Sequence, residues 1–410
     1  MDTPITPKER NILRRLANQV AELAIRPIEQ EKRDLWLRHN ALEATRPLIF
    51  CDPENGWGEI LPADQLECES GLTRWWEFRL RQEIFWGTQM CDDRAIEPYF
   101  DIGHVYSETD WGMHETEIKS AEGGSYVWES PLKDYAGFAE LRFPQITIDN
   151  AATARLMEQA QDLLGDLLTV RLRNGWWWSL GLTNTVIKLR GLERMMLDMF
   201  DHPEELHHLM GFIRDGNLAR LDWLESHALL SLNTDGSYVG SGGFGWTREL
   251  PQPDFSGQVR TKDMWGFCES QETVGVSPNM FAEFVLPYQL PILERFGLNC
   301  YGCCEPLDKR WPFIKQIPRL RRVSISPWSN REKMAEVLGA NYIFSMKPTP
   351  ADIAMETFDE DQIRTGLQKD LQITRGCRVE VIMKDNHTIR HDPSRVIRWV
   401  QIARQEAEKV

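Results

Sequence analysis

The last third of the sequence constrains the fold most, because short apolar runs alternate there with helical segments. The runs at 298–302, 323–326, 342–346 and 379–383 have the length and composition of buried strands. Strands that alternate with helices of ordinary length form parallel βαβ units. The pattern therefore predicts an α/β protein with a parallel sheet and helices outside it.

The earlier part of the chain contains similar elements. Further strands are expected at 46–51, 96–103, 143–148, 176–180 and 264–270, and helices at 5–45, 70–87, 191–199, 203–226 and from Ser277 onward. Roughly eight βα units fill a closed barrel, which the chain is long enough to form. We predict a single (β/α)8 TIM barrel over 46–410, with an N-terminal helical extension over 1–45. A doubly wound open sheet is the alternative.

Composition restricts the functions that the chain can have. The formal net charge of -15, from 62 acidic and 47 basic residues, argues against non-specific nucleic-acid binding, which needs a basic face. No stretch approaches the length of a membrane span, and the charged N-terminus lacks the apolar run of a signal peptide. We therefore expect a cytoplasmic protein with neither nucleic acid nor membrane as a partner. Disulfides are rare in that compartment.

Three of the eight cysteines stand within five residues, at Cys300, Cys303 and Cys304. A fourth, Cys377, stands just before the apolar run 379–383. Thiolates select zinc or copper(I), and clustered cysteines in a cytoplasmic protein more often bind metal or do chemistry than form disulfides. The alternative is that they are buried residues that only fill space. We favour a functional role for the cluster.

Polar side chains follow several predicted strands, and α/β barrels keep their catalytic groups at these carboxyl ends. Candidate acid–base residues are Asp101, Glu269 and His387, and candidate substrate contacts are Trp265, Ser270, Tyr301 and Lys384. A helix cap is the alternative role for Asp101, and a structural hydrogen bond is the alternative for His387. Most of the sixteen tryptophans are expected to pack in the core, with one or two at the pocket.

From about residue 260 the sequence resembles the uroporphyrinogen decarboxylase superfamily, which includes the methylcobamide-dependent methyltransferases. The resemblance rests on the acid-Ser pair Glu269-Ser270 and on the later elements Ser277-Pro278, Phe281, Glu283-Phe284 and Pro287-Tyr288. Segment 298–305 stands where the methyltransferases carry a His-x-Cys-Gly zinc segment, and 375–377 where they carry the last zinc thiolate. Upstream, 99–102 is similar to the strand that ends in the decarboxylases' catalytic aspartate. About half of the chain is covered.

This resemblance implies a barrel fold and zinc held by Cys303 and Cys377. Glu305 is the first candidate for a further ligand, and Cys304, His387 and Glu269 are the alternatives. The resemblance also implies a corrinoid cofactor carried by a separate protein, and, by analogy alone, a homodimer. The sequence departs from the family in two places. The decarboxylases' arginine-rich motif has no match around Arg46, which argues against a tetrapyrrole decarboxylase. Tyr301 stands where the methyltransferases have their first histidine ligand.

The leading hypothesis is a methyltransferase that moves a methyl group between a small methylated substrate and a corrinoid protein. An aryl methyl ether, a methylated amine or a methylated thiol could be the substrate, and an ether needs a proton or a metal to stabilise its leaving oxygen. One alternative is a carboxy-lyase for a smaller acid, in which Asp101 stabilises a cationic intermediate. A non-catalytic binding barrel is the other alternative.

Overall fold

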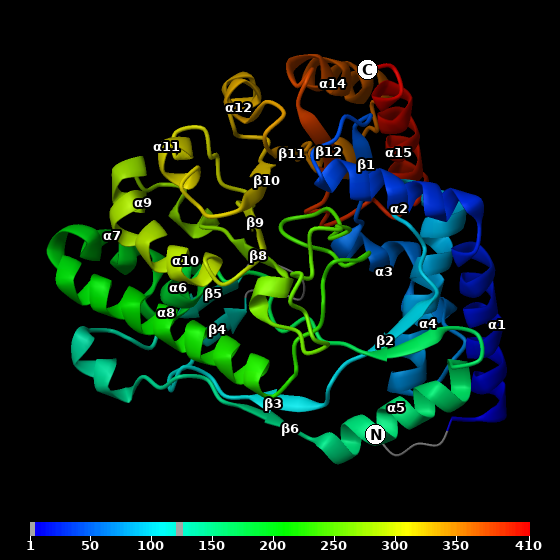
Figure 1. Ribbon diagram of the computed structural model, residues 1–410, viewed down its shortest axis with the longest axis horizontal. Coiled ribbons are helices and arrows are strands. Elements are labelled where there is room, and N and C mark those ends of the chain that lie inside the picture. The colour runs from blue at the N-terminus through cyan, green and yellow to red at the C-terminus, as the bar shows by residue number, and fades with distance from the viewer. Residues whose placement is uncertain (1–4, 120–125) are drawn as a thin grey trace.

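The computed structural model describes residues 5–119 and 126–410, in which parallel strands lie inside a layer of helices (Figure 1). The larger sheet has six parallel strands in the order β1-β12-β11-β10-β9-β8. Their bounds are β1 (Leu48–Cys51), β12 (Arg378–Met383), β11 (Ile343–Met346), β10 (Leu320–Ile325), β9 (Leu298–Tyr301) and β8 (Trp265–Cys268). Nearly every residue of these strands is buried, as the continuous apolar runs predict for a sheet covered on both faces.

The first strand of the chain pairs with the last, since Leu48 to Cys51 of β1 run beside Glu380 to Met383 of β12. A second parallel sheet contains only β2 (Tyr99–Ile102) and β7 (Thr169–Leu172). No ladder joins this sheet to the larger one within the described ranges. The predicted α/β class and parallel sheet are therefore confirmed, whereas closure of an eight-stranded barrel stays a prediction.

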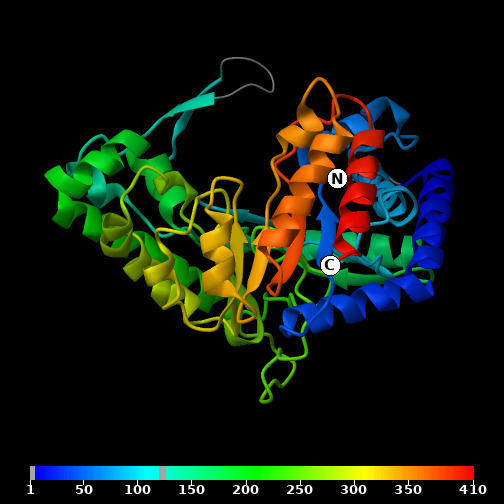
Figure 2. The same ribbon diagram turned by 90° about the horizontal axis from the view of Figure 1, so that it is seen from above.

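Helices cover the outside of the strands, and two short antiparallel pairs lie beyond them (Figure 1). The helices are α1 (Pro7–Ala24), α2 (Pro27–Asn40), α3 (Trp57–Ile60), α4 (Gly71–Phe85), α5 (Asn150–Leu164), α6 (Thr183–Arg190), α7 (Leu192–Asp201), α8 (Pro203–Ser226), α9 (Pro278–Phe284), α10 (Leu286–Leu293), α11 (Trp311–Ile314), α12 (Arg331–Leu338), α13 (Ala351–Ala354), α14 (Glu360–Ile373) and α15 (Ser394–Ala407). The antiparallel pairs are β3 (Tyr106–Glu108) with β6 (Ile146–Ile148), and β4 (Thr116–Lys119) with β5 (Tyr126–Glu129), which projects from the body in Figure 2.

The N-terminal helical region begins with a capping box. The Thr6 hydroxyl accepts a hydrogen bond from Glu9 N, and the Glu9 carboxylate accepts one from Thr6 N. The single helix expected over 5–45 is wrong, because α1 ends at Ala24 and α2 begins at Pro27. Proline has no N–H and disfavours helical backbone at the residue before it, so the chain breaks there. The division of the chain at residue 45 stays a prediction.

One predicted strand is absent and another lies in a different place. The run 176–180 has no regular secondary structure. Its three tryptophan side chains line the interior cavities and do not alternate between the two faces of a sheet. Within 143–148 only β6 is extended, and it pairs with β3 outside the parallel sheets. Aromatic residues favour strands, but here packing against the interior overrides that propensity.

A glycine-rich segment, residues 236–245, enters the space beside the larger sheet. A side chain at Gly240 would come within 2.8 Å of Cys300 Cβ, and one at Gly243 would come within 2.8 Å of the Glu380 carboxylate. Both glycines have positive φ, +69° and +90°, which a residue with a Cβ rarely adopts. Only glycine therefore allows the segment to pass so close to the strands.

A group of buried polar side chains lies against this segment, and we call His39, Arg322, Ser345, Lys347 and Glu380 the interior network. The Glu380 carboxylate accepts hydrogen bonds from Arg322 Nη2 at 3.1 Å and from Ser345 Oγ at 2.5 Å. His39 Nε2 lies 3.2 Å from the same carboxylate, and Lys347 Nζ donates to Ser345 Oγ at 2.7 Å. Burial by itself raises the pKa of Glu380, but Arg322 and His39 outweigh it and lower that pKa to about 2. The carboxylate is therefore ionised.

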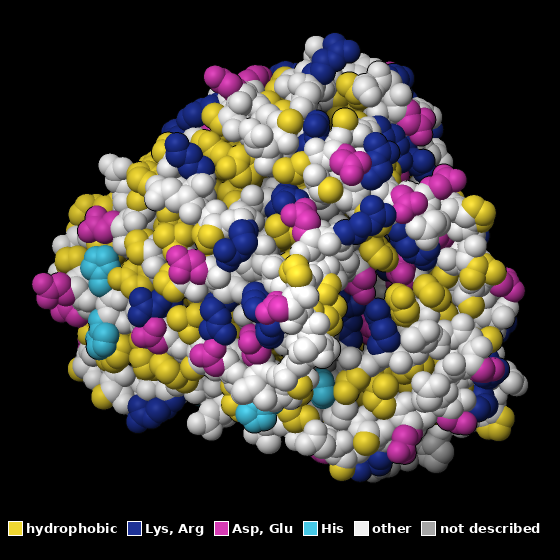
Figure 3. Space-filling model, in the orientation of Figure 1, with side chains coloured by type: hydrophobic (Ala, Val, Ile, Leu, Met, Phe, Trp, Pro, Cys, Tyr) yellow, Lys and Arg dark blue, Asp and Glu magenta, His cyan; other side chains and the backbone are white. Residues whose placement is uncertain are grey.

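None of the helices in the described part of the chain is both long and apolar enough to cross a bilayer. On the face in Figure 3, basic and acidic side chains are interspersed and no broad basic area is visible.

Candidate active site at the strand ends

Two neighbouring cavities lie beside the parallel strands, and we name them by their walls. The charged chamber, about 390 Å³, is lined by side chains from β2 and β7 and by Arg79, Arg94 and Asp235. The aromatic chamber, about 370 Å³, is lined by Phe50, Asp52, Glu54, Trp86, Arg94, Trp178, Gly236, Tyr238, Phe244 and Lys384. Because Arg94, Gly236 and Tyr238 belong to both walls, the chambers adjoin each other.

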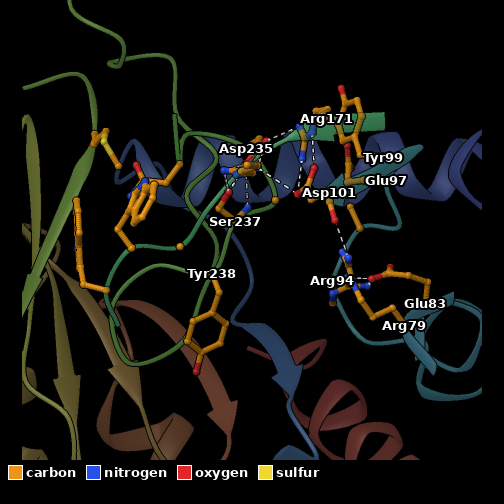
Figure 4. Close-up of a pocket in the computed structure, with 18 residues that line it drawn as sticks. Arg79, Glu83, Arg94, Glu97, Tyr99, Asp101, Arg171, Asp235, Ser237 and Tyr238 are labelled. Atoms are coloured by element: carbon orange, nitrogen blue, oxygen red, sulfur yellow. Dashed lines mark hydrogen bonds and ion pairs between the residues drawn. The ribbon is translucent and has the colours of Figure 1, made fainter. Parts of the chain in front are cut away.

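Asp101 points into the charged chamber, where it meets arginine (Figure 4). Arg171, its register partner on β7, donates from Nε and Nη2 to the two Asp101 carboxylate oxygens at 2.7 and 2.9 Å. Arg171 and Arg173 also donate to Asp235 Oδ2, at 3.1 and 2.9 Å. The charge of Asp101 is thus already compensated, so this carboxylate is poorly placed to stabilise a cationic intermediate alone, as the carboxy-lyase hypothesis requires.

The aromatic chamber combines flat walls with a cation. Lys384, which follows β12, places its ammonium 5.9 Å from the Trp178 ring centre and 3.8 Å from the Glu54 carboxylate. Phe50 packs against Trp86 and Phe244, so the wall is made of rings in contact with one another. Such a cavity suits a flat apolar ligand with a small number of polar contacts.

Glu269 follows β8 and is almost completely buried, with 1% of its surface exposed. Its carboxyl oxygens accept hydrogen bonds from Ser179 Oγ at 3.2 Å and from Gln271 N at 2.9 Å. No basic side chain in the described part of the chain forms an ion pair with it. Burial, together with the neighbouring Glu272 and Glu305 carboxylates, raises the pKa of Glu269 to about 9. The carboxyl is therefore protonated at neutral pH and can donate its proton.

Cys303 follows β9, and the groups around it lower the pKa of its thiol. Cys304 Sγ lies 3.6 Å from Cys303 Sγ, and Ser241 Oγ donates to Cys303 Sγ at 3.2 Å. The Cys304 hydrogen bond, opposed by burial and aided by Lys384 and Ser241, lowers the pKa of Cys303 below its usual range. The same hydrogen bond raises the pKa of the Cys304 thiol. A lowered pKa makes a cysteine nucleophilic at neutral pH.

Three of the predicted site residues form a buried support beneath this edge. The Glu305 carboxylate accepts hydrogen bonds from Ser270 N at 2.8 Å and from Cys303 N at 2.9 Å, which ties the loops after β8 and β9 together. The Tyr301 hydroxyl donates to Gln289 Oε1 at 2.8 Å. All three side chains are fully buried. Ser270 and Tyr301, predicted as substrate contacts, are engaged in this support, and Glu305 is occupied by backbone donors.

The predicted zinc ligands do not come together. Cys377 precedes β12, whereas Cys303 follows β9, so the two thiols lie at opposite edges of a parallel sheet. The Cys377 thiol instead donates to Ala335 O at 3.5 Å. No group of three or more His, Cys, Asp or Glu side chains in the described ranges is arranged to hold a metal ion. The set Cys303, Cys377 and Glu305 thus does not fit zinc, because spacing along the chain does not fix the edge of the sheet.

Two further candidates lie away from both chambers. His387 is exposed beyond β12, with Nδ1 at 3.4 Å from Asn55 Nδ2. Trp265 is the first residue of β8, so it lies at the edge opposite Glu269, where its buried indole donates to Gly245 O at 2.9 Å. The structure thus gathers Glu269, Cys303 and Lys384 at one edge and places Asp101 in the adjoining interior.

Other residues at the site are absent from the sequence-based candidates. Lys347 follows β11 directly, and burial lowers its pKa to about 8. The strand-end rule that selected Glu269 could have selected it as well. Ser241 and Tyr238 belong to the glycine-rich segment, whose path beside the strands has no sequence signature. Arg79 lies on α4, and nothing in the pattern of that helix shows that it reaches a cavity.

Comparisons with known proteins give little further information. No family model matches the chain, and no curated protein matches its sequence. Among solved structures, the chain is similar to a methyltransferase from Methanosarcina mazei, with a TM-score of 0.47 and 10% sequence identity. That match covers 91% of this chain and 97% of the other.

Proposed function

We propose that the protein transfers a methyl group from a small aryl methyl ether to a separate acceptor, and that Glu269 protonates the departing oxygen. The observation that carries this proposal is the neutral, buried carboxyl of Glu269, at the strand-end edge and joined through Ser179 to the wall that contains Trp178. An ether oxygen is a poor leaving group unless a proton or a Lewis acid stabilises its charge.

In this reaction the bond between the ether oxygen and the methyl carbon breaks, and its electron pair stays on the oxygen. A proton from Glu269 converts the phenoxide into a phenol and leaves Glu269 as a carboxylate, which regains a proton from solvent after product release. The rings of the aromatic chamber hold the substrate plane and limit its motion, which lowers the entropic cost of reaching the reactive geometry. Lys384 at the same wall favours negative charge developing on the oxygen.

The acceptor in this proposal is a corrinoid carried by a partner protein, whose reduced cobalt supplies the nucleophile for the methyl group. The protein's own contribution is to bind and orient the ether and to hold the proton on Glu269. No step is assigned to zinc, because the predicted ligands lie at two edges of the sheet.

The test is a demethylation assay with methoxylated aromatic compounds and free cob(I)alamin as acceptor. We expect phenol formation together with loss of the cob(I)alamin absorbance. Glu269→Gln keeps the shape of the side chain but removes the acidic proton, so the rate should fall roughly 10²- to 10⁴-fold.

A matched control is Glu283→Gln, since Glu283 is an exposed carboxylate on α9 that is not among the groups raising the pKa of Glu269. This variant should keep most of the activity. Full activity in Glu269→Gln would contradict the proposal. Release of carbon dioxide from an added acid, with no methyl transfer from any ether, would favour the carboxy-lyase instead.

A further inference from the structure

The charged chamber contains one arginine that forms no ion pair with a carboxylate in the described part of the chain (Figure 4). Arg94 donates to both Glu83 carboxylate oxygens at 2.7 and 2.6 Å, and Arg171 is paired with Asp101. Arg173 is paired with Asp235. The remaining acid of the wall, Glu97, is bound at 2.6 Å by Arg33, which lies outside the lining. Every carboxylate that lines the chamber therefore has an arginine partner already.

Arg79 is the remaining cation. Its Nη1 donates to the backbone oxygen of Asp101 at 2.6 Å, and its guanidinium lies 4.8 Å from the centre of the Phe100 ring. Within residues 5–119 and 126–410, no carboxylate approaches it to ion-pair distance. The guanidinium has five N–H donors and a permanent charge, so this contact satisfies only a part of its capacity. A largely desolvated cation of this kind is stabilised by an anion that enters the cavity.

The position of Arg79 relates it to the proposed reaction. Trp176 and Trp177 line the charged chamber, and Trp178, the next residue, lines the aromatic chamber. Ser179 then bonds to Glu269. One continuous stretch of chain thus passes from the wall of the charged chamber to the general acid. A ligand whose ring lies in the aromatic chamber can extend a substituent through the shared boundary at Tyr238 into the charged chamber.

We propose that the substrate is a methoxylated aromatic carboxylic acid and that Arg79 binds its carboxylate. This inference rests on the proposed function, which assigns the methyl ether group at the other end of the substrate. A carboxylate matches the planar fork of a guanidinium and adds a single negative charge, which can pair with the one guanidinium of the wall that has no ion pair. A neutral ether would leave Arg79 without an anion, and a doubly charged phosphate would leave excess negative charge near Asp101 and Glu83.

Calorimetric titration without any corrinoid tests the inference separately from catalysis. The probes are 4-methoxybenzoate and its neutral analogue 4-methoxybenzyl alcohol. We expect the wild-type protein to bind the acid at least tenfold more tightly than the alcohol. Arg79→Gln should weaken binding of the acid by roughly 10- to 100-fold and leave binding of the alcohol unchanged, because a hydrogen-bonded charge pair is lost only with the acid.

The matched control is Arg81→Gln, on the same helix, since Arg81 pairs with Glu77 at 2.7 Å and lines neither chamber. It should bind the acid like the wild type. If Arg79→Gln does not fold, Arg79→Lys keeps the charge without the planar fork and should bind the acid with intermediate affinity. Equal binding of acid and alcohol, unchanged acid binding in the Arg79 variants, or binding of neither probe would overturn the inference. Arg79-dependent acid binding without methyl transfer would support it while contradicting the proposed function.

Discussion

The interior network and the strand-end site, which contains Glu269, Cys303 and Lys384, each bury a glutamate, but the pKa values of the two glutamates shift in opposite directions. In the interior network, Glu380 is completely buried but faces Arg322 and His39, so its pKa falls to about 2. At the strand-end site, Glu269 is equally buried but faces only carboxylates and hydrogen-bond donors, so its pKa rises to about 9. Burial penalises charge in both places, and the neighbouring charges decide which protonation state survives.

In the proposed function, this difference separates a structural site from a reactive one. A paired buried charge fixes the arrangement of strands β10 and β12, and it has no proton to exchange near neutral pH. An unpaired buried carboxyl keeps a proton that a substrate can take. Functional sites are enriched in groups of the second kind, whose pKa values are shifted by desolvation and a few specific neighbours.

Breaking the interior network should have the largest effect. Glu380→Ala leaves the buried Arg322 without its carboxylate, and such losses cost about 3–5 kcal/mol of the free energy of unfolding. Urea denaturation measures this. The double variant Arg322→Met/Glu380→Leu should recover much of the loss, because no charge is then left unpaired. A single variant less than about 1 kcal/mol below the wild type would show that Arg322 finds another partner or water.

The pH dependence of stability sharpens the comparison. The folded pKa of Glu269 lies above its unfolded value, so the stability it contributes is full below the unfolded pKa of about 4.3 and is lost as the pH rises toward about 9. Glu380 behaves oppositely, because its folded pKa is depressed and its contribution is lost as the pH falls toward about 2. Urea unfolding across this range should show that Glu269→Gln removes the loss on the alkaline side alone. An unchanged slope would mean that Glu269 is ionised in the folded protein.

The Lys384 ammonium should control the reactivity of Cys303. Lys384→Met removes a nearby positive charge, so the pKa of Cys303 should rise and its alkylation by iodoacetamide at neutral pH should slow by roughly tenfold for each unit of pKa. Peptide mass mapping follows each cysteine separately. Cys300 is the internal control, because burial raises its pKa to about 11 and it should stay unmodified in both proteins. Equal rates at Cys303 would show that Cys304 and Ser241 lower the pKa of Cys303 without the lysine.

Removing the Cys377 thiol should have the smallest effect. Cys377→Ser changes one hydrogen bond at the edge opposite the site, so the free energy of unfolding should change by less than about 1 kcal/mol. The rate of Cys303 alkylation should not change. A metal-content measurement on both proteins completes the test. Loss of bound zinc in this variant would show that Cys377 is a zinc ligand, in contradiction to its separation from Cys303 in the structure.

The local sequence pattern was sufficient to predict secondary structure where residues close together in the chain decide it. The apolar runs around 298–302 and 379–383 form β9 and β12, and Thr6, Ser70 and Ser277 cap the helices that follow them. The run at 176–180 failed as a strand because its tryptophans pack into two cavities. Glu269 and Lys384 were selected by their position after predicted strands, and the structure places both at one edge of the sheet, because groups that follow parallel strands share an edge.

The sequence by itself determined the α/β class, the parallel strands and which acids and thiols stand at strand ends. Those features depend on periodicity and on residues close together in the chain. Only the tertiary structure decided that Glu269 has no cation beside it, that Arg171 compensates Asp101, and that Cys377 lies at the far edge from Cys303. Electrostatic interactions act through space and depend on burial, so neither a pKa nor a ligand set follows from spacing along the chain.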